Sequence, residues 1–300
     1  MSSLLREIDS TNRNLEGIIS SGAKTQNPLT FRSVDWHLTT RCNYNCKFCF
    51  AQKLDRETCD PRFIEKVLKN LMSLGIEKIN FAGGEPLLHP LFFDITKTAK
   101  ELGFVVSVLS NGYYLNKDIV SKLSLYVDWI GLSVDSAHEE VEMALGRGNG
   151  NHVKHVTELA DIVHKAGVKL KINTTVTRLN FAEDMRPLLK NLMPERWKAF
   201  QVLHIKGQND RYFNELSITD KEFGHFKSVN QVCIGEIEPV FERNHDMIDS
   251  YFMLSPGGRV MSNRDGTNDS LTSLDRIDKQ NMSQLLDVQK YVQRGGIYSW

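Results

Sequence analysis

The 300-residue sequence has no excess charge of either sign and no long apolar run. Lys and Arg together number 37, as do Asp and Glu, so the formal net charge is zero. A neutral chain has no overall field that would attract nucleic acid or an anionic membrane. No segment approaches the roughly 18 apolar residues that a membrane-spanning helix requires, and the first residues do not follow the pattern of a secretory signal. We expect a cytoplasmic monomer that binds neither nucleic acid nor membranes.

The sequence is also poor in cysteine and lacks the common phosphate-binding loop. Five cysteines, an odd number in a chain without an export signal, argue against a disulfide framework. No Gly-x4-Gly-Lys-Ser/Thr motif is present. The run Gly-Arg-Gly-Asn-Gly at 146–150 follows a helical segment rather than a strand, so it does not fit a dinucleotide fingerprint.

Short β-prone segments alternate with helix-like segments through the first two thirds of the chain. Strands are expected at 33–39, 76–81, 104–109, 128–134, 168–174 and 197–203, and helices near 61–74, 90–102, 117–125, 151–166 and 183–192. This alternation implies a parallel sheet with right-handed crossovers. Six such units predict an α/β fold, a partial (β/α)6 barrel of the TIM type over residues 33–206.

The two ends of the chain break this rhythm. Residues 1–32 are expected to form a leader with a short helix, and residues 207–300 a C-terminal extension that completes the substrate site. Within the extension, Thr219 and Glu222 stand in capping-box register before a helix near 219–231. The segments 251–254 and 259–261 flank a Ser-Pro-Gly-Gly turn and predict a hairpin that covers the open side of the barrel.

Three of the five cysteines lie close together, in the pattern Cys42-x3-Cys46-x2-Cys49 directly after the first expected strand. In a parallel barrel this is the end of the strands where ligands bind. Three thiolates on one loop can hold three irons of a four-iron cluster and leave the fourth iron open. The alternative is a structural zinc site, with Cys59 or His37 as fourth ligand, in a non-catalytic interaction protein. The spacing favours the cluster, and we expect Cys59 and Cys233 to be buried thiols.

Cations recur at positions that a parallel barrel would turn inward. In the fifth strand Lys169, Lys171 and Asn173 alternate with apolar residues. A buried cation needs a compensating anion, although a solvated sheet edge would also explain this pattern. Further cations near strand ends, Lys78, Arg196 and Lys198, favour a bound polyanion such as a nucleoside triphosphate.

Two motifs together resemble the radical S-adenosylmethionine (SAM) superfamily: the cysteine triplet and the Gly-Gly-Glu-Pro turn at 83–86 after the second expected strand. Within it, the chain resembles the viperin family over roughly residues 33 to 300. The matching segments include Trp36-His37, 78–86, Ser110-Asn111-Gly112, Gly146-Arg147-Gly148, Arg196-Trp197-Lys198, Asp249-Ser250-Tyr251 and Arg294-Gly295-Gly296.

The resemblance implies two cofactors and their ligands. A 4Fe-4S cluster would be held by Cys42, Cys46 and Cys49, and its open iron would chelate the amino and carboxylate groups of SAM. The residues that the resemblance places around SAM are Phe48, Gly83, Gly84, Glu85, Ser110, Ser133, Arg147 and Asn173. Among them, the Gly-Gly-Glu-Pro turn would meet the amino group of SAM and Arg147 its carboxylate.

The resemblance also implies the reaction. A 5′-deoxyadenosyl radical would remove the C4′ hydrogen of a nucleoside triphosphate, giving a 3′-deoxy-3′,4′-didehydro nucleotide that terminates RNA synthesis, an antiviral product. CTP is the first choice, with UTP and GTP open. Lys78, Lys171, Arg196 and Lys198 would hold the triphosphate, and Tyr251 would supply a hydrogen or relay an electron near the sugar. A peptide- or cofactor-modifying radical SAM enzyme is the other enzymatic reading, but such enzymes commonly carry further cysteines, and only Cys233 lies beyond residue 59.

Three further expectations follow from the resemblance. The electron donor would be of the flavodoxin or ferredoxin type. The terminal Trp300 would close over the site or recruit iron–sulfur assembly factors. Asp35 stands where animal viperins carry Asn, close to the expected nucleotide site, which leaves the identity of the base open.

Overall fold

The computed structural model describes residues 31–231, 237 and 239–300. The expected leader, apart from Phe31 and Arg32, and Cys233 therefore lie outside the described residues. No helix in the described part of the chain is long and apolar enough to span a bilayer.

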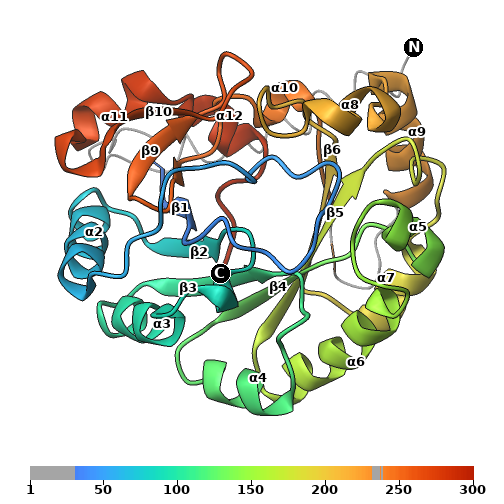
Figure 1. Ribbon diagram of the computed structural model, residues 1–300, viewed down its shortest axis with the longest axis horizontal. Coiled ribbons are helices and arrows are strands. Elements are labelled where there is room, and N and C mark those ends of the chain that lie inside the picture. The colour runs from blue at the N-terminus through green and yellow to red at the C-terminus, as the bar shows by residue number, and fades with distance from the viewer. Residues whose placement is uncertain (1–30, 232–236, 238) are drawn as a thin grey trace, which may run out of the picture.

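A single ten-stranded sheet curls into an open barrel (Figure 1). In sheet order its strands are β10 (Asp269–Ser273), β9 (Arg259–Ser262), β8 (Met253–Leu254), β1 (Ser33–His37), β2 (Lys78–Ala82), β3 (Val105–Ser110), β4 (Trp129–Ser133), β5 (Lys169–Val176), β6 (Arg196–Gln201) and β7 (Val240–Glu242). The strands from β8 through β1 to β7 run parallel, whereas β9 and β10 are antiparallel to their neighbours. The α/β partial barrel expected from the strand–helix alternation is confirmed.

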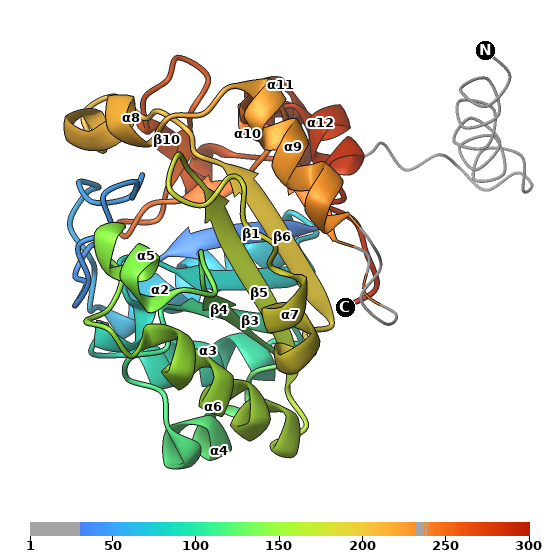
Figure 2. The ribbon, with the colours of Figure 1, turned by 90° about the vertical axis from the view of Figure 1, so that its right-hand side faces the viewer.

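Helices surround the outer face of the sheet, as both views show (Figures 1 and 2). Those between successive parallel strands are α2 (Pro61–Ser73), α3 (Phe92–Glu101), α4 (Lys117–Leu123), α5 (Glu139–Ala144), α6 (His152–Lys165) and α7 (Arg186–Leu192). The later helices are α8 (Asp210–Leu216), α9 (Asp220–Asn230), α10 (Asn244–Met247), α11 (Lys279–Leu285) and α12 (Val288–Gln293), with single 3-10 turns at η1 (Pro86–Leu88) and η2 (Leu274–Arg276).

The apolar core lies between the sheet and these helices, because the strands alternate. Val34 and Trp36 of β1 are buried on the outer face, and the Trp36 ring packs 6.0 Å from that of Phe81 in β2. Helix α2 meets them with a buried stripe at helical spacing: Ile64, Val67, Leu68 and Leu71. The residues between the apolar ones, such as Asp35 and Asn80, face the interior of the barrel and hydrogen-bond each other there.

The C-terminal part of the chain adds strands to both edges of the six-strand core. The expected hairpin is confirmed as β8 and β9, which pair antiparallel, and β8 joins β1. On the opposite edge, β7 joins β6, an addition that the sequence did not predict. Strand β7 has three residues, too few to give a recognisable period-2 pattern. The sheet thus ends in β10 on one side and β7 on the other.

The capping box at the start of α9 generates a stability prediction. The Thr219 hydroxyl accepts from the Glu222 amide at 3.3 Å, and the Glu222 carboxylate accepts from the Thr219 amide at 2.8 Å. Thr219→Ala should lower the free energy of unfolding by about 1 kcal/mol, measured by denaturant unfolding. Thr219→Ser, which keeps the hydroxyl, is the control. Equal stability of the alanine variant and the parent would contradict this role.

Candidate active site

The cysteine loop connects β1 to α2 at the carboxyl ends of the parallel strands, and glycines allow it to sit there. The Gly84 amide donates to the Thr39 carbonyl at 2.6 Å, and the Glu85 amide to the Arg41 carbonyl at 2.8 Å. A Cβ on Gly84 would lie 2.3 Å from the Arg41 carbonyl oxygen, and one on Gly146 equally close to that of Asn45. Glycine at these two positions therefore allows the backbone to approach the cysteine loop more closely than any larger residue could.

The three thiols of this loop suit a cluster better than a single ion. Cys42 is exposed, Cys46 and Cys49 are partly exposed, and all three are free. Burial raises the pKa of the Cys46 thiol to about 12, so the thiolate form requires a strong positive charge beside it, as a bound metal supplies. Among residues 31–231, 237 and 239–300, no three Cys, His, Asp or Glu side chains converge on one ion. Cluster ligands bind separate irons and need no such convergence.

The two expected fourth ligands of a zinc site lie elsewhere. Cys59 is exposed, which corrects the expectation of a buried thiol. It directly precedes Asp60, whose carboxylate caps α2, so it belongs to the polar surface where that helix begins. His37 is buried, its pKa is lowered by burial, and its ring packs edge-on against Phe50 at 5.7 Å. Neither residue joins the cysteine triplet to form the closed four-ligand set of structural zinc.

The Gly-Gly-Glu-Pro turn is fixed to the end of β3 beside the cysteine loop. The buried Glu85 carboxylate accepts hydrogen bonds from the Ser110 hydroxyl at 2.9 Å and the Asn111 amide at 2.9 Å. Burial raises the pKa of Glu85 to about 7, although these donors oppose the shift. The Asn111 side chain in turn lies 3.7 Å from the Cys42 sulfur. Four residues expected around SAM, namely Gly83, Gly84, Glu85 and Ser110, are thus adjacent to the triplet.

The remaining four residues expected around SAM lie on β4, on β5, on the cysteine loop and, for Arg147, between α5 and α6. Arg147 is buried with its guanidinium 2.6 Å from Asp135 and 5.5 Å from the centre of the Phe48 ring. Ser133 and Asn173 are register partners in β4 and β5. The Asn173 side-chain oxygen is buried and has no hydrogen-bond partner within the described residues. An unpaired buried acceptor facing a site is a feature that a bound ligand would satisfy.

The interior of the barrel carries an excess of positive charge. Lys78, Lys171 and Lys198 are buried, and Arg196 and Arg294 lie among them, whereas the carboxylates of this group are Asp35 and Glu242. Burial and neighbouring charges lower the pKa of Lys78 to about 6, of Lys171 to about 8 and of Lys198 to about 7. Lys171, only 7% exposed, forms no hydrogen bond or ion pair with any described residue. Of the polar residues expected on one face of β5, Lys171 is buried and Asn173 partly buried, whereas Lys169, at the start of the strand, is exposed.

Aromatic side chains of the C-terminal tail close the barrel at the amino ends of its strands. The Lys78 ammonium donates to the Tyr298 hydroxyl at 2.6 Å and lies 4.6 Å from the Trp129 ring. The Arg196 guanidinium lies 3.7 Å from the Tyr298 ring. Trp300 packs against Tyr298 with ring centres 5.2 Å apart. The chain end lies near the middle of the barrel in Figure 1. These cations are therefore at the end opposite the cysteine loop.

Tyr251 sits in a charged environment and not among core aromatics. Its hydroxyl donates to Glu242 at 2.5 Å and accepts from Lys198 at 3.2 Å, while the Arg294 guanidinium lies 3.3 Å from its ring centre. Glu242 and Arg294 were not among the expected site residues. Glu242 had no local sequence signal, because the three residues of β7 give no recognisable alternation, and Arg294 appeared only inside a matching segment.

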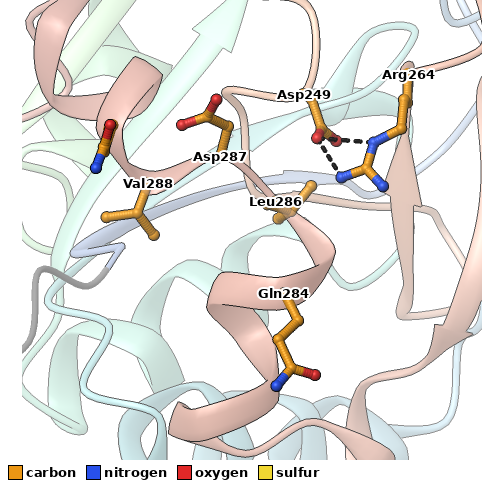
Figure 3. A pocket seen from close by; sticks show the side chains of 7 residues that line it. Asp249, Arg264, Gln284, Leu286, Asp287 and Val288 are labelled. Atoms are coloured by element: carbon orange, nitrogen blue, oxygen red, sulfur yellow. Dashed lines mark hydrogen bonds and ion pairs between the residues drawn. The ribbon is translucent and has the colours of Figure 1, made fainter.

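A separate cavity of about 530 Å³ lies on the outer surface beside α11 and α12 (Figure 3). Its Arg264 binds the Asp249 carboxylate through two guanidinium nitrogens, and the Asp287 amide donates to the Asp249 carbonyl at 2.8 Å. The backbone of Asp249 adopts the left-handed conformation, with φ of 63°. The cavity holds none of the expected site residues. Its contacts instead anchor the segment that leads into the barrel at Tyr251.

The ligand assignment of the triplet generates a direct prediction. Cys42→Ala, Cys46→Ala and Cys49→Ala should each abolish stable iron binding after anaerobic reconstitution, because a cluster held by three thiolates loses a third of its protein ligands. Cys59→Ala should retain the parent's iron and sulfide content. Iron analysis and absorption spectroscopy provide the measurement. Loss of iron in Cys59→Ala, or zinc in its place, would refute the assignment.

Comparison with known proteins agrees with this geometry. Residues 36–192, just over half of the chain, match the family model described as the radical SAM superfamily. The fold is shared with Streptococcus suis SuiB bound to S-adenosylmethionine, at a TM-score of 0.63 and 14% identity, over 98% of this chain and 79% of that one. The structure of anSMEcpe with bound AdoMet and Kp18Cys peptide gives a TM-score of 0.64 at 16% identity, over 87% and 82% of the two chains.

Curated relatives narrow the family. A protein of Thermoplasmatales archaeon (strain ISO4-H5) named S-adenosylmethionine-dependent nucleotide dehydratase is 38% identical over 92% of this chain and 99% of its own length. One of Flammeovirga pacifica with the same name is 36% identical, over 89% and 96%. The Oncorhynchus mykiss protein named S-adenosylmethionine-dependent nucleotide dehydratase RSAD2 is 31% identical, over 92% and 82%. The chain therefore belongs to the radical SAM superfamily and, within it, to the viperin family of S-adenosylmethionine-dependent nucleotide dehydratases.

Proposed function

We propose that this protein dehydrates a nucleoside triphosphate, with CTP as first choice, to its 3′-deoxy-3′,4′-didehydro analogue in a SAM-dependent radical reaction. The observation that carries the substrate class is the buried excess of cations inside the barrel, above all Lys171, which has no hydrogen-bond or ion-pair partner among the described residues. Burying a cation without an anion is costly, and a triphosphate supplies several negative charges. The names of the curated relatives support the same substrate class.

The residues present fit both cofactors. Cys42, Cys46 and Cys49 would hold the 4Fe-4S cluster, which, with SAM bound, supplies one-electron reductive cleavage of SAM. The neighbouring Glu85 and Ser110, fixed to each other by hydrogen bonds, and the buried Arg147 would orient SAM. The unpaired oxygen of Asn173 would accept a hydrogen bond there. Proximity and exclusion of water then matter more than acid–base strength.

The distribution of charge along the barrel orients the substrate. Lys78 and Arg196 are the first residues of β2 and β6, at the end of the barrel that the C-terminal tail closes. Lys171 lies two residues after Lys169, the first residue of β5. Phosphates held there leave the ribose between the cations and the cysteine loop. The Lys198 ammonium donates to the Tyr251 hydroxyl, and this contact with the cation group supports a position for Tyr251 near the bound nucleotide. Burial raises the pKa of Tyr251 well above its usual value, so the phenol keeps its proton for transfer.

Asp35 supports a base with an amino group. Its carboxylate faces the barrel interior and accepts a hydrogen bond from the Asn80 amide at 2.6 Å. Carboxylate oxygens accept hydrogen bonds, so Asp35 would favour the N4 amino group of cytosine over the O4 carbonyl of uracil. This preference supports CTP over UTP, with GTP to be tested beside them.

We infer three further properties of the working enzyme. The exposed Cys42 brings the cluster loop to the surface, where an electron donor of the flavodoxin or ferredoxin type can approach. Trp300 packs on Tyr298, so recruitment of iron–sulfur assembly factors would require the tail to leave the barrel. A cytoplasmic monomer that binds neither nucleic acid nor membranes agrees with the neutral charge.

The decisive experiment uses triphosphates deuterated at C4′. Anaerobically reconstituted enzyme with SAM and dithionite should transfer deuterium into 5′-deoxyadenosine with CTP and release the didehydro product. Mass spectrometry of both products provides the measurement. Omission of SAM is the control. Unlabelled 5′-deoxyadenosine with all four triphosphates would refute the substrate assignment.

The lowered lysine pKa values predict a pH dependence of binding. Lys171 has a pKa of about 8 in the nucleotide-free protein, so it is charged below and neutral above that pH. A polyanion binds the charged form and raises its pKa, so affinity is highest below pH 8 and declines above it. We expect the dissociation constant of CTP to rise at least about tenfold between about pH 8 and pH 9.5, measured by calorimetry. Lys171→Arg, always charged, should flatten the profile; an unchanged profile would argue against Lys171 as a phosphate ligand.

A further inference from the structure

Side chains link strand β7, one edge of the sheet, to the segment before β8, with which β7 forms no backbone ladder. Strand β7 ends at Glu242, and Tyr251 lies two residues before β8. The Tyr251 hydroxyl donates a hydrogen bond to the Glu242 carboxylate. Lys198, on the strand next to β7, binds both groups. Side chains thus connect two parts of the barrel that no backbone ladder connects.

Glu242 is the charged centre of this contact. It is fully buried, and its carboxylate accepts from the Lys198 ammonium and from Tyr251, with the Arg294 guanidinium 3.7 Å away. Burial alone would raise the pKa of Glu242, but the charges of Lys198 and Arg294 lower it below its ordinary value. Glu242 therefore stays ionised, and an ionised acceptor makes the stronger hydrogen bond to the phenol.

The remaining contacts of Tyr251 leave its hydroxyl a single orientation. The phenol has one proton and two lone pairs. The proton is donated to Glu242, one lone pair accepts from Lys198, and the Arg294 guanidinium lies 3.3 Å from the ring centre. The second lone pair is the one part of the hydroxyl without a described partner. Without the Glu242 carboxylate, the Tyr251 hydroxyl could donate its proton to other acceptors, including a bound phosphate.

We propose that Glu242 is the positioning residue of Tyr251: its carboxylate fixes the phenol and reserves Lys198 and Arg294 for that purpose, leaving Lys78, Lys171 and Arg196 for the phosphates. This inference rests on the proposed function. It assigns to one carboxylate two effects of opposite sign. Glu242 assists turnover through Tyr251, and it weakens nucleotide binding, because it is a negative charge inside a site for a polyanion.

Glu242→Gln separates these effects, because glutamine keeps the shape and one acceptor oxygen but removes the charge. Turnover of CTP should fall about tenfold or more, since a charged hydrogen bond is replaced by a neutral one. The dissociation constant of CTP, measured by calorimetry on the reconstituted enzyme without SAM, should stay equal or fall by up to about tenfold. Glu101→Gln, an exposed carboxylate at the end of α3, is the matched control and should change neither quantity.

A double-mutant cycle tests whether Glu242 acts through Tyr251. Combined with Tyr251→Phe, Glu242→Gln should cause little additional loss, because the phenol on which it acts is already absent. Weaker CTP binding in Glu242→Gln, or losses that multiply in the double variant, would overturn the inference and identify Glu242 as a structural residue. Parent enzyme that neither binds nor converts any triphosphate would overturn the proposed function and the inference together. Active parent enzyme with multiplying losses would overturn the inference alone.

Discussion

Burial of more cations than carboxylates inside the barrel is the constraint on which the rest of the site depends. A lysine removed from water without a counter-charge loses hydration that nothing else restores, and it responds by a lowered pKa. Lys78, Lys171 and Lys198 all show that response. The interior compensates only in part, through Glu242 and through aromatic faces such as Trp129 and Tyr298 beneath the Lys78 ammonium. A bound polyanion would complete the compensation. The unfavourable free energy of burying these lysines unpaired would then be relieved on binding, which favours the bound state.

Strand polarity separates this charge from the cofactor loop. In a parallel barrel the loops after the strands gather at one end, and the triplet, the Gly-Gly-Glu-Pro turn and Arg147 are all in such loops. Lys78 and Arg196 begin their strands and therefore lie at the other end, which Tyr298 and Trp300 close. The proposed function therefore has the phosphates at the closed end and the sugar toward the cofactors. In that proposal the orientation of the substrate follows from the direction of the strands.

The sequence was informative where chemistry is local in the chain. The triplet lies within eight positions, and alternation in β5 correctly indicated a buried Lys171, although Lys169, expected on the same face, is exposed where the strand begins. The sequence was uninformative where the site is assembled from distant segments: Glu242, Tyr251 and Arg294 meet from three elements, one of which has only three residues. Cys59 was wrongly expected to be buried because a free thiol was treated as a small apolar side chain, whereas its position before the α2 cap, Asp60, determined its exposure.

The side-chain link between β7 and the segment before β8 follows from the same constraint. An apolar pair would join these two segments without desolvating a carboxylate, and replacing buried ion pairs by packed apolar residues is often stabilising. Here that solution would leave Lys198 and Arg294 as two more buried cations without a counter-charge, in a barrel that already contains Lys171 unpaired. A carboxylate at the end of β7 limits the excess, and it does so beside Tyr251, the phenol to which we assign transfer to the sugar in the proposed function. In that proposal, balancing the buried cations and positioning Tyr251 are two consequences of one buried charge.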